Sequence, residues 1–388
     1  MPTQTVTRSI ITPSAIVRLV LGWGAFGLLL VLHPLFAKLS AMPTIVLFSV
    51  LAAIVAVIVV CAFGVVIEAE HLAHRLGDPY GTLVLTLSIV MIEVILIAAV
   101  MLGPGDHPTI ARDSVMAVSM IILNLVIGVA LVVGGLKRGS LRHNRTGTST
   151  YLALLIVLLA LALAIPAVIG VGGAYTMGQA IPIAALTVVF YVFFLVRQMG
   201  AQKADFQEVT VEIGERGNEG TEDGSGSRAP IAEVLRQHRG ELIARTLLLI
   251  ATVIPIVLLS HDMASLLDTG LERLGAPVAL SGLLIAMIVF LPETITTIRA
   301  AAMGEAQRVS NLCHGALVST VGLTIPAVLV IGMLTGQTVQ LAESPVNLVL
   351  LGVTLLLSVV TFSNKRTTVL HGAAHLMVFL VYALTMFA

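Results

Sequence analysis

The chain contains eleven apolar stretches that are each long enough to cross a lipid bilayer. A transmembrane helix needs roughly 20 consecutive apolar residues. The stretches cover residues 15–37, 43–68, 80–103, 115–136, 151–170, 178–197, 243–261, 280–304, 312–334, 345–362 and 367–387. Because 57% of the residues are hydrophobic and only 11% are charged, an ordinary soluble domain is excluded. We predict an all-α polytopic membrane protein with about eleven transmembrane helices.

The basic residues lie mostly on one side of these predicted helices. If the N-terminus is cytoplasmic, 18 of the 21 Lys and Arg residues lie in cytoplasmic segments, and only Lys38, Arg112 and Arg273 lie outside. An excess of Lys and Arg marks the cytoplasmic side of a membrane protein. We therefore predict a cytoplasmic N-terminus and an outside C-terminus. The formal net charge is zero, so we expect ions and membrane lipids as partners and no nucleic acid.

Two segments about 200 residues apart resemble each other. Arg75-Leu-Gly-Asp-Pro79 reappears as Arg273-Leu-Gly-Ala-Pro277, and Met91-Ile-Glu93 matches Leu291-Pro-Glu293. The third predicted helix runs outward and the eighth runs inward, so the two copies cross the membrane in opposite senses. Inverted repeats of this kind are typical of secondary transporters.

The repeat divides the chain into four parts. Residues 1–42 form an N-terminal tail and a peripheral first helix, and residues 43–197 form the first five-helix repeat. Residues 198–242 form a cytoplasmic linker, and residues 243–388 form the second five-helix repeat.

Each repeat carries one glutamate inside an apolar helix, Glu93 in the first and Glu293 in the second. A charge at the bilayer centre costs at least about 2.5 kcal/mol, so such a residue usually has a function. Two carboxylates balance one divalent cation or two protons, and hard cations prefer oxygen ligands. Pro292 removes a backbone donor beside Glu293, which a membrane helix tolerates where it lines a cavity. We predict that the pair binds a metal cation or protons; the alternative is a protonated glutamate pair that only joins helices.

Polar residues near the two glutamates are candidates for further ligands. We favour Ser88, Asn124, Thr296 and Ser319, from a wider set that also includes Thr82, Thr86, Thr294, Thr297, Asn311 and Thr320. Each hydroxyl could instead bond to its own helix. Glu70 and Asp268 are related by the repeat and lie at opposite helix ends, where they would concentrate cations or simply be solvated acids.

The histidines give no pattern typical of a metalloenzyme. His71 and His74, and His371 and His375, could each share a helix face, but no zinc-hydrolase motif accompanies them. The sequence also has no glycine-rich phosphate loop. We therefore expect no enzyme and no cofactor, and leave the role of His371 and His375 open, between proton handling and packing.

The linker is acidic and ends in a glycine-rich piece at Gly217–Ser227. Asp205, Glu208, Glu212, Glu215 and Glu219 are three or four residues apart, which places them along one face if the segment is helical. We expect a solvated, flexible connector; the alternative is a strip that attracts cations or regulates transport.

The motifs resemble the two α-repeats of the calcium/cation antiporter superfamily, and more narrowly the bacterial ChaA-type calcium/proton antiporters of the CAX branch. The resemblance rests on the segment from His71 to Leu83 followed by Glu93, and on Pro292-Glu-Thr-Ile-Thr followed by Asn311-Leu-Cys-His-Gly and the segment to Pro326. It implies an ion held between Glu93 and Glu293 and movable second and seventh helices. The family's usual Gly-Asn-x-x-Glu is replaced here by Ile89-Val-Met-Ile-Glu93.

The combined prediction is a proton-coupled antiporter of a bacterial inner membrane that exports calcium by alternating access. A sodium or potassium/proton antiporter of the same fold is the alternative, and a cation channel is a less favoured one. The transported cation, the proton stoichiometry and the oligomeric state are left open.

Overall fold

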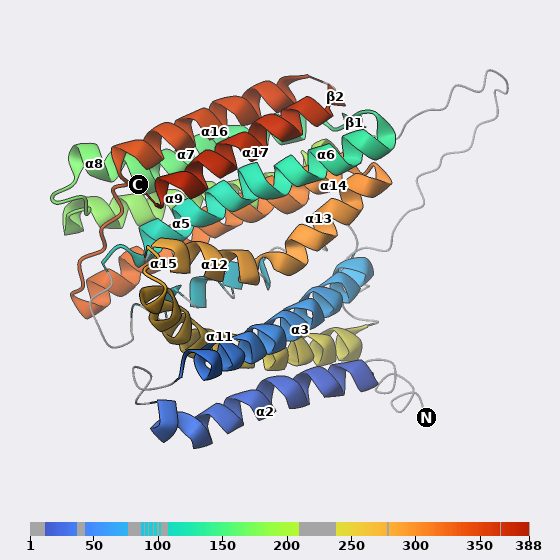
Figure 1. Ribbon diagram of the computed structural model, residues 1–388. Helices are drawn as coiled ribbons and strands as arrows, with labels where there is room; N and C mark the ends of the chain where they lie inside the picture. The colour runs from blue at the N-terminus through green and yellow to red at the C-terminus, as the bar shows by residue number, and fades with distance from the viewer. Residues whose placement is uncertain are drawn as a thin grey trace.

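A computed structural model describes residues 12–36, 43–76, 108–208, 238–277, 279–364 and 366–387. Between positions 77 and 107 it describes only 87–88, 90–91, 93–95, 97–98 and 101. The predicted spans correspond to helices wherever they fall in these residues, and the predicted all-α polytopic class is confirmed (Figure 1). The third expected span, 80–103, lies mostly outside the described residues.

The elements follow one another in a simple order, with only four residues in named strands. They are α2 (Pro13–Phe36), α3 (Thr44–Leu76), α5 (Ile110–Met120), η2 (Ile121–Val126), α6 (Ile127–Arg138), β1 (Leu141–Arg142), α7 (Arg145–Leu159), η3 (Ala160–Ala164), α8 (Ile165–Ile169), α9 (Met177–Met199), η4 (Lys203–Phe206), α11 (Arg239–Arg273), α12 (Ala279–Val289), α13 (Leu291–Met303), α14 (Ala306–Ser310), η5 (Asn311–Gly315), α15 (Ala316–Thr335), α16 (Pro345–Ser363), β2 (Arg366–Thr367) and α17 (Val369–Thr385).

Within the described part of the chain, eight helices are long and apolar enough to span a membrane, or nine if the bent pair α12–α13 is one span. The helix α17 is apolar but only 17 residues long. Several observed helices exceed the predicted stretches. The clearest case is α11, predicted at 243–261, which continues unbroken to Arg273. The prediction ended it at the polar His261 and Asp262, but helix hydrogen bonds are local and persist beyond an apolar stretch.

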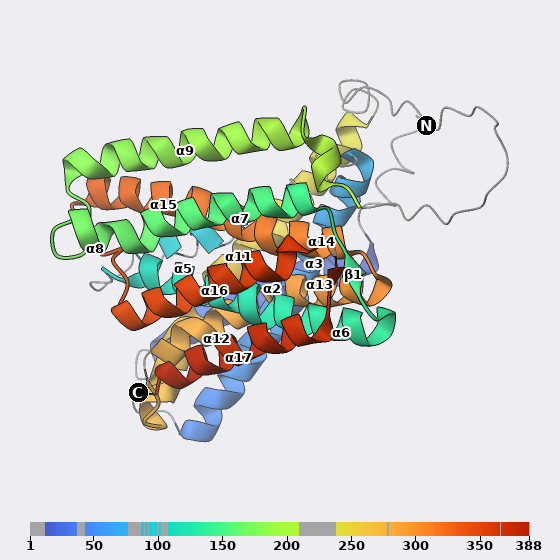
Figure 2. The ribbon, with the colours of Figure 1, turned by 90° about the horizontal axis from the view of Figure 1, so that it is seen from above.

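The helices form two groups that are visible in Figure 1. The long helices α3 and α11 pack along each other and against α2. The other helices form a larger bundle, in which α17 packs on α6 and α9 packs on α15. Figure 2 shows α9 along one edge of this bundle, beside α15. These two contacts correspond to each other, since each joins the last helix of one predicted repeat to the middle span of the other.

Contacts between loops show which helix ends lie together. At one end, β1 pairs with β2 in antiparallel register. At the other end, the Gln340 amide donates to the Pro108 carbonyl at 2.8 Å. We call the first end the linker end, because α9 ends and α11 begins there. Successive spans therefore alternate in direction, as the repeat predicts.

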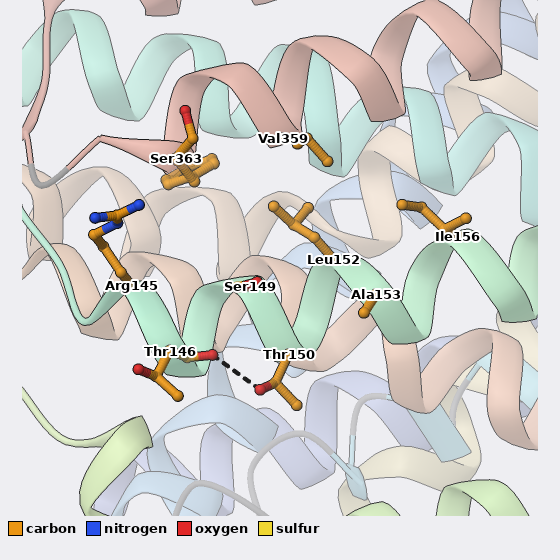
Figure 3. Close-up of a pocket in the computed structure, with 10 residues that line it drawn as sticks. Arg145, Thr146, Ser149, Thr150, Leu152, Ala153, Ile156, Val359 and Ser363 are labelled. Carbon is orange, nitrogen blue, oxygen red and sulfur yellow. Dashed lines mark hydrogen bonds between the residues drawn. The ribbon is translucent and has the colours of Figure 1, made fainter.

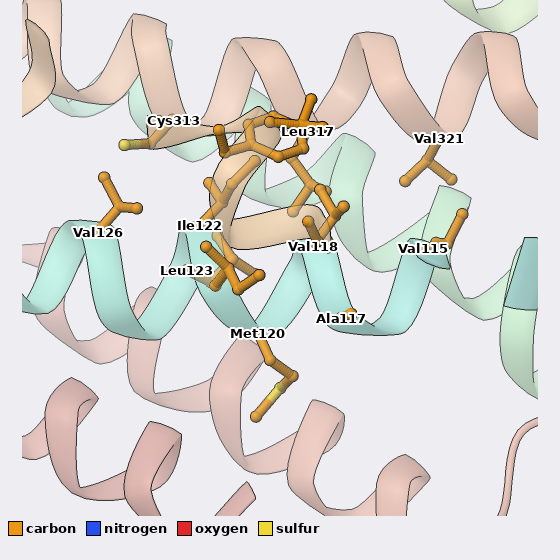
Figure 4. Packing of buried hydrophobic residues seen from close by; sticks show 14 of the residues in the cluster. Val115, Ala117, Val118, Met120, Ile122, Leu123, Val126, Cys313, Leu317 and Val321 are labelled. Carbon is orange, nitrogen blue, oxygen red and sulfur yellow. The ribbon is translucent and has the colours of Figure 1, made fainter. Parts of the chain in front are cut away.

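Two middle spans contain matching π-helical turns, η2 in the first repeat and η5 in the second. Both contain the sequence Asn-Leu-x-x-Gly, beginning at Asn124 and at Asn311. The turns lie beside each other, and their apolar side chains pack at the centre of the bundle (Figure 4). A π turn inside a helix is frequent at functional sites.

The predicted span 280–304 is broken in the middle. The helices α12 and α13 meet at an angle of 58° near Phe290. Pro292 lies in the first turn of α13, where proline's missing N–H costs no helix bond. The break therefore falls one to three residues before Glu293, as the proline predicted.

The start of the linker is folded, which corrects the expectation of a flexible connector for residues 198–208. Phe206 is buried against Tyr151 and Phe194, at ring-centroid distances of 5.0 and 6.0 Å. The Asn311 amide donates to the Phe206 carbonyl at 2.7 Å. Only Lys203–Phe206 is helical here, so Asp205 and Glu208 do not share a face of a longer helix. Gly217–Ser227, Glu212, Glu215 and Glu219 lie outside the described residues.

Glu208 caps a helix that is distant in sequence. Its carboxylate accepts hydrogen bonds from the backbone N–H groups of Gln307 and Arg308, at 3.1 to 3.2 Å. The N-cap residue of α14, Glu305, makes no side-chain cap of its own. The first N–H groups of a helix need such acceptors, so the linker completes α14.

Replacing Glu208 by Ala should lower the free energy of unfolding by about 1 kcal/mol, because two helix amides lose their acceptor. The measurement is thermal unfolding of the purified protein in detergent. Gln207→Ala is the matched control, since the Gln207 side chain is exposed and makes no hydrogen bond to the described residues. Equal melting temperatures for Glu208→Ala and Gln207→Ala would contradict the capping role.

Candidate functional site

Glu93 lies on the buried face of the third span. Val90, Glu93, Ile97 and Met101 are 1, 3, 2 and 4% exposed, whereas Met91 is 48% exposed. Their spacing of three or four residues defines one face of a helix. The carboxylate is therefore directed into the protein, away from the surface that a membrane would cover.

Glu293 lies in the first turn of α13, immediately after the bend. It is 8% exposed, and its carboxylate makes no hydrogen bond to the described residues. The two glutamates are close enough for their charges to interact. Residues 200 positions apart, each from a different repeat, thus meet in the protein interior.

The carboxylate of Glu93 is only half satisfied. The Thr320 hydroxyl on α15 donates to Glu93 Oε2 at 2.8 Å. The other oxygen, Oε1, is buried without a hydrogen-bond partner among the described residues. A buried carboxylate oxygen without a partner is costly, so it indicates a missing ligand or proton. Thr297 and Cys313 lie next to Glu293; the Cys313 Sγ is 4.0 Å from the Thr297 hydroxyl.

Of the candidate ligands in the described part of the chain, Thr320 is the one whose hydroxyl donates to a glutamate carboxylate. The Thr296 hydroxyl bonds to the Pro292 carbonyl, and the Ser319 hydroxyl bonds to the Gly315 carbonyl of its own helix. The Asn124 side chain contacts Thr354 and His375. Ser88 is half-buried. A role for Ser88, Asn124, Thr296 or Ser319 as ligand stays a prediction.

Asn124 belongs to a separate buried network that joins three spans. Its amide donates to the Thr354 hydroxyl at 2.9 Å, and its Oδ1 lies 3.2 Å from His375 Nδ1. The opposite nitrogen, His375 Nε2, lies 3.1 Å from the Thr361 hydroxyl. All four side chains have no exposed surface. No sequence pattern pointed to Thr354 and Thr361, although they lie seven residues apart on one face of α16.

The two histidines that the sequence left open have different environments. His375 belongs to this buried network, whereas His371 Nδ1 accepts from the Thr368 backbone N–H at 3.1 Å and caps α17. A third histidine, His314 on η5, stacks near Tyr151 and contacts Phe362. Within the described residues, no group of three His, Cys, Asp or Glu side chains could hold a metal ion.

The predicted vestibule acids lie at opposite ends of the protein. Glu70 is at the linker end of α3, 3.8 Å from the Arg308 guanidinium, and Asp268 is exposed near the far end of α11. A stronger charge contact lies beside Glu70. Arg245 on α11 binds Glu68 on α3 at 2.9 Å, with both side chains less than a tenth exposed. This ion pair ties α3 to α11, and sequence periodicity had not identified it.

Comparisons with known proteins agree with this architecture. The family model described as sodium/calcium exchanger protein matches residues 46–200 and 245–388. The chain is 33% identical over 361 residues to the sodium-potassium/proton antiporter ChaA of Escherichia coli (strain K12), covering 93% of this chain and 94% of that protein. Native YfkE has a similar structure, with a TM-score of 0.69 and 18% identity over 95% of this chain and 99% of YfkE. The H+/Ca2+ exchanger CAX gives a TM-score of 0.64 at 13% identity, over 96% of this chain and 89% of that one.

The chain belongs to the sodium/calcium exchanger protein family, and the resemblance to the calcium/cation antiporter superfamily is confirmed. It is a multi-pass membrane protein and a cation antiporter of that family, which is a transporter class and not a class of enzymes.

Asn124→Leu should reduce the free energy of unfolding by about 1–3 kcal/mol, because His375 Nδ1 loses its partner inside the protein. His375→Phe should have a similar effect by leaving Asn124 Oδ1 unpaired. The double variant should lose less than the sum, since it removes both halves of the contact. Thermal unfolding of the four proteins in detergent measures this cycle, and additive losses would show that the two side chains are not coupled.

Proposed function

We propose that the protein is a cation/proton antiporter of a bacterial inner membrane, with its N-terminus in the cytoplasm, and that Glu93 and Glu293 alternately bind the cation and protons. The observation that carries the proposal is the buried pair itself. Two carboxylates, one from each inverted repeat, lie within electrostatic range, and Glu93 Oε1 has no partner in the described residues.

The mechanism follows from charge. Two ionised carboxylates in an apolar interior attract a cation strongly, because few other charges or waters screen them there. Protonation removes that attraction, so the cation and protons compete for the same oxygens. If the site opens to each side in turn, a proton gradient drives the cation the other way. The bend at Phe290 places Glu293 at a helix end, where irregular backbone can supply further oxygen ligands.

We favour calcium as the exported cation, because two carboxylates balance one divalent ion and calcium accepts six to eight oxygen ligands. Two solved proteins of similar fold are named as calcium/proton exchangers. Sodium or potassium is the alternative, and it is supported by the name of the ChaA relative at 33% identity. Calcium, sodium and potassium are substrates in this proposal, not resident cofactors.

A cation channel is the less favoured alternative. Both glutamates are less than a tenth exposed, which suits a site that is closed between binding events better than an open pore. The discriminating experiment is ion flux into vesicles that contain the purified protein and carry an imposed pH gradient, tested separately with calcium, sodium and potassium. Saturable uptake coupled to proton movement supports the antiporter, and cation flux without proton movement contradicts it.

Glu93→Gln and Glu293→Gln should each reduce exchange in this assay to that of empty vesicles, because an amide can neither balance the cation nor release a proton. Glu272→Gln is the control, since Glu272 is an exposed acid near the far end of α11. Protein content per vesicle should be equal for all variants. Exchange near the wild-type rate in either site variant would refute the paired site.

Thr320→Val should weaken apparent cation affinity about tenfold or more, because a hydrogen bond to a charged group contributes about 1.5–3 kcal/mol. The valine keeps the side-chain shape and removes the donor to Glu93. Thr324→Val is the matched control one turn further on α15, where the buried hydroxyl has no partner among the described residues. Equal affinities in the two variants would show that the Thr320 contact does not serve the ion site.

The apparent cation affinity should rise with pH and level off once both carboxylates are ionised. Below that range, a cation that displaces two protons should bind about a hundredfold more tightly per pH unit, and one that displaces a single proton about tenfold. Cation dependence of transport, measured from about pH 6 to pH 9, gives this slope and so the number of protons. An affinity that is independent of pH for every cation would exclude direct competition.

A further inference from the structure

A pocket of about 750 Å³ lies between α7 and α16 at the linker end of the bundle. Figure 3 shows it from close by, with side chains of both helices along its walls. Its size is within the usual range for small-molecule sites, and no residue of the proposed ion site lines it.

The lining changes in polarity along the pocket. At the linker end it holds the Arg145 guanidinium and the hydroxyls of Ser149 and Ser363. Further along the helices it is apolar, with Ile156 and Val359 43% and 40% exposed. In a spanning helix these apolar side chains face hydrocarbon, whereas the first turn of α7 lies near the headgroups. The pocket is therefore polar where a lipid headgroup would lie and apolar where an acyl chain would lie.

The charge of the pocket is positive and not neutralised by the protein. Arg145 lines it without an ion pair or hydrogen bond to any described residue, and no acidic residue lines it. The ribbon next to both helices carries Arg142 directly opposite Arg366. Like charges directly opposite on paired strands destabilise each other. An anion in the pocket would pair with Arg145, at the basic end of the two helices.

We propose that this pocket binds an anionic phospholipid, with its phosphate at Arg145 and the Ser149 hydroxyl and one acyl chain between α7 and α16. Arginine binds phosphate oxygens in a two-point geometry, and the hydroxyl of Ser149 can donate to the same group. The Ser363 hydroxyl already donates to the Val360 carbonyl at 2.8 Å. The site is separate from Glu93 and Glu293, and this lipid site does not depend on which cation the protein transports.

The test is lipid binding to the purified full-length protein in detergent, by native mass spectrometry, with phosphatidylglycerol and phosphatidylcholine of identical acyl chains. The wild type should bind phosphatidylglycerol more tightly. Arg145→Gln should weaken phosphatidylglycerol binding about fivefold and leave phosphatidylcholine unchanged, because one basic residue contributes about 1 kcal/mol toward an anionic lipid. Ala153→Phe, which places a ring in the pocket, should weaken both lipids.

Two variants serve as matched controls. Arg239, like Arg145, is an exposed arginine at the first position of a spanning helix at the linker end, and Ala167 is an exposed alanine outside the pocket. Arg239→Gln and Ala167→Phe should bind both lipids as the wild type does. The proposal is overturned if Arg145→Gln binds phosphatidylglycerol like the wild type, or if inorganic phosphate alone displaces it. It is also overturned if Ala153→Phe converts an oligomer to a monomer, because the pocket would then hold a second copy of the chain.

Discussion

Two carboxylates buried in an apolar bundle are the constraint on which the rest of the structure depends. An ionised carboxylate costs several kcal/mol to remove from water, and a second one nearby adds repulsion. Among the described residues, one side chain donates a hydrogen bond to either carboxylate: the Thr320 hydroxyl donates to Glu93. In the proposed mechanism a cation or protons complete this pair, and competition between them couples their movements.

The bend between α12 and α13 and the two π turns determine where the two glutamates lie. The bend at Phe290 brings Glu293 to the beginning of α13, and the π turns η2 and η5 pack together behind it. Buried apolar side chains of the turns and of the adjoining helices, including Val118, Ile122 and Leu317, pack together there (Figure 4). Close-packed interiors deform little. We therefore infer that the conformational change of the proposed alternating access occurs where α3 and α11 meet the bundle. The Arg245–Glu68 ion pair holds these two helices to each other, which favours their moving as a unit.

Sequence patterns predicted what depends on local composition. Apolar length predicted the spans, the repeat predicted the glutamate pair, and Pro292 predicted the break beside Glu293. Other contacts between distant residues were not predicted. Glu208 caps a helix about 100 residues further on, and Asn124 pairs with His375 at a separation of 251 residues. Both contacts depend on how the folded spans pack against each other. The periodicity of a single sequence does not show that packing. For the same reason Asn124 was favoured over Thr320 as a ligand, although Thr320 is the residue that contacts a glutamate carboxylate in the described part of the chain.

The two halves of the predicted inverted repeat carry matching π turns, but the side chains around the two glutamates differ. Aligning the π turns on Asn124 and Asn311 places Val133 of α6 at the position of Thr320 on α15. Valine has no hydrogen to donate, so Glu293 lacks the contact that Glu93 has. The hydroxyl at Thr320 favours the ionised form of Glu93, since a hydrogen bond to a charged acceptor is about twice as strong as one to a neutral acceptor. The two carboxylates are therefore in unequal surroundings: Glu93 has a donor in Thr320, whereas Glu293, in the first turn after the bend, has none among the described residues.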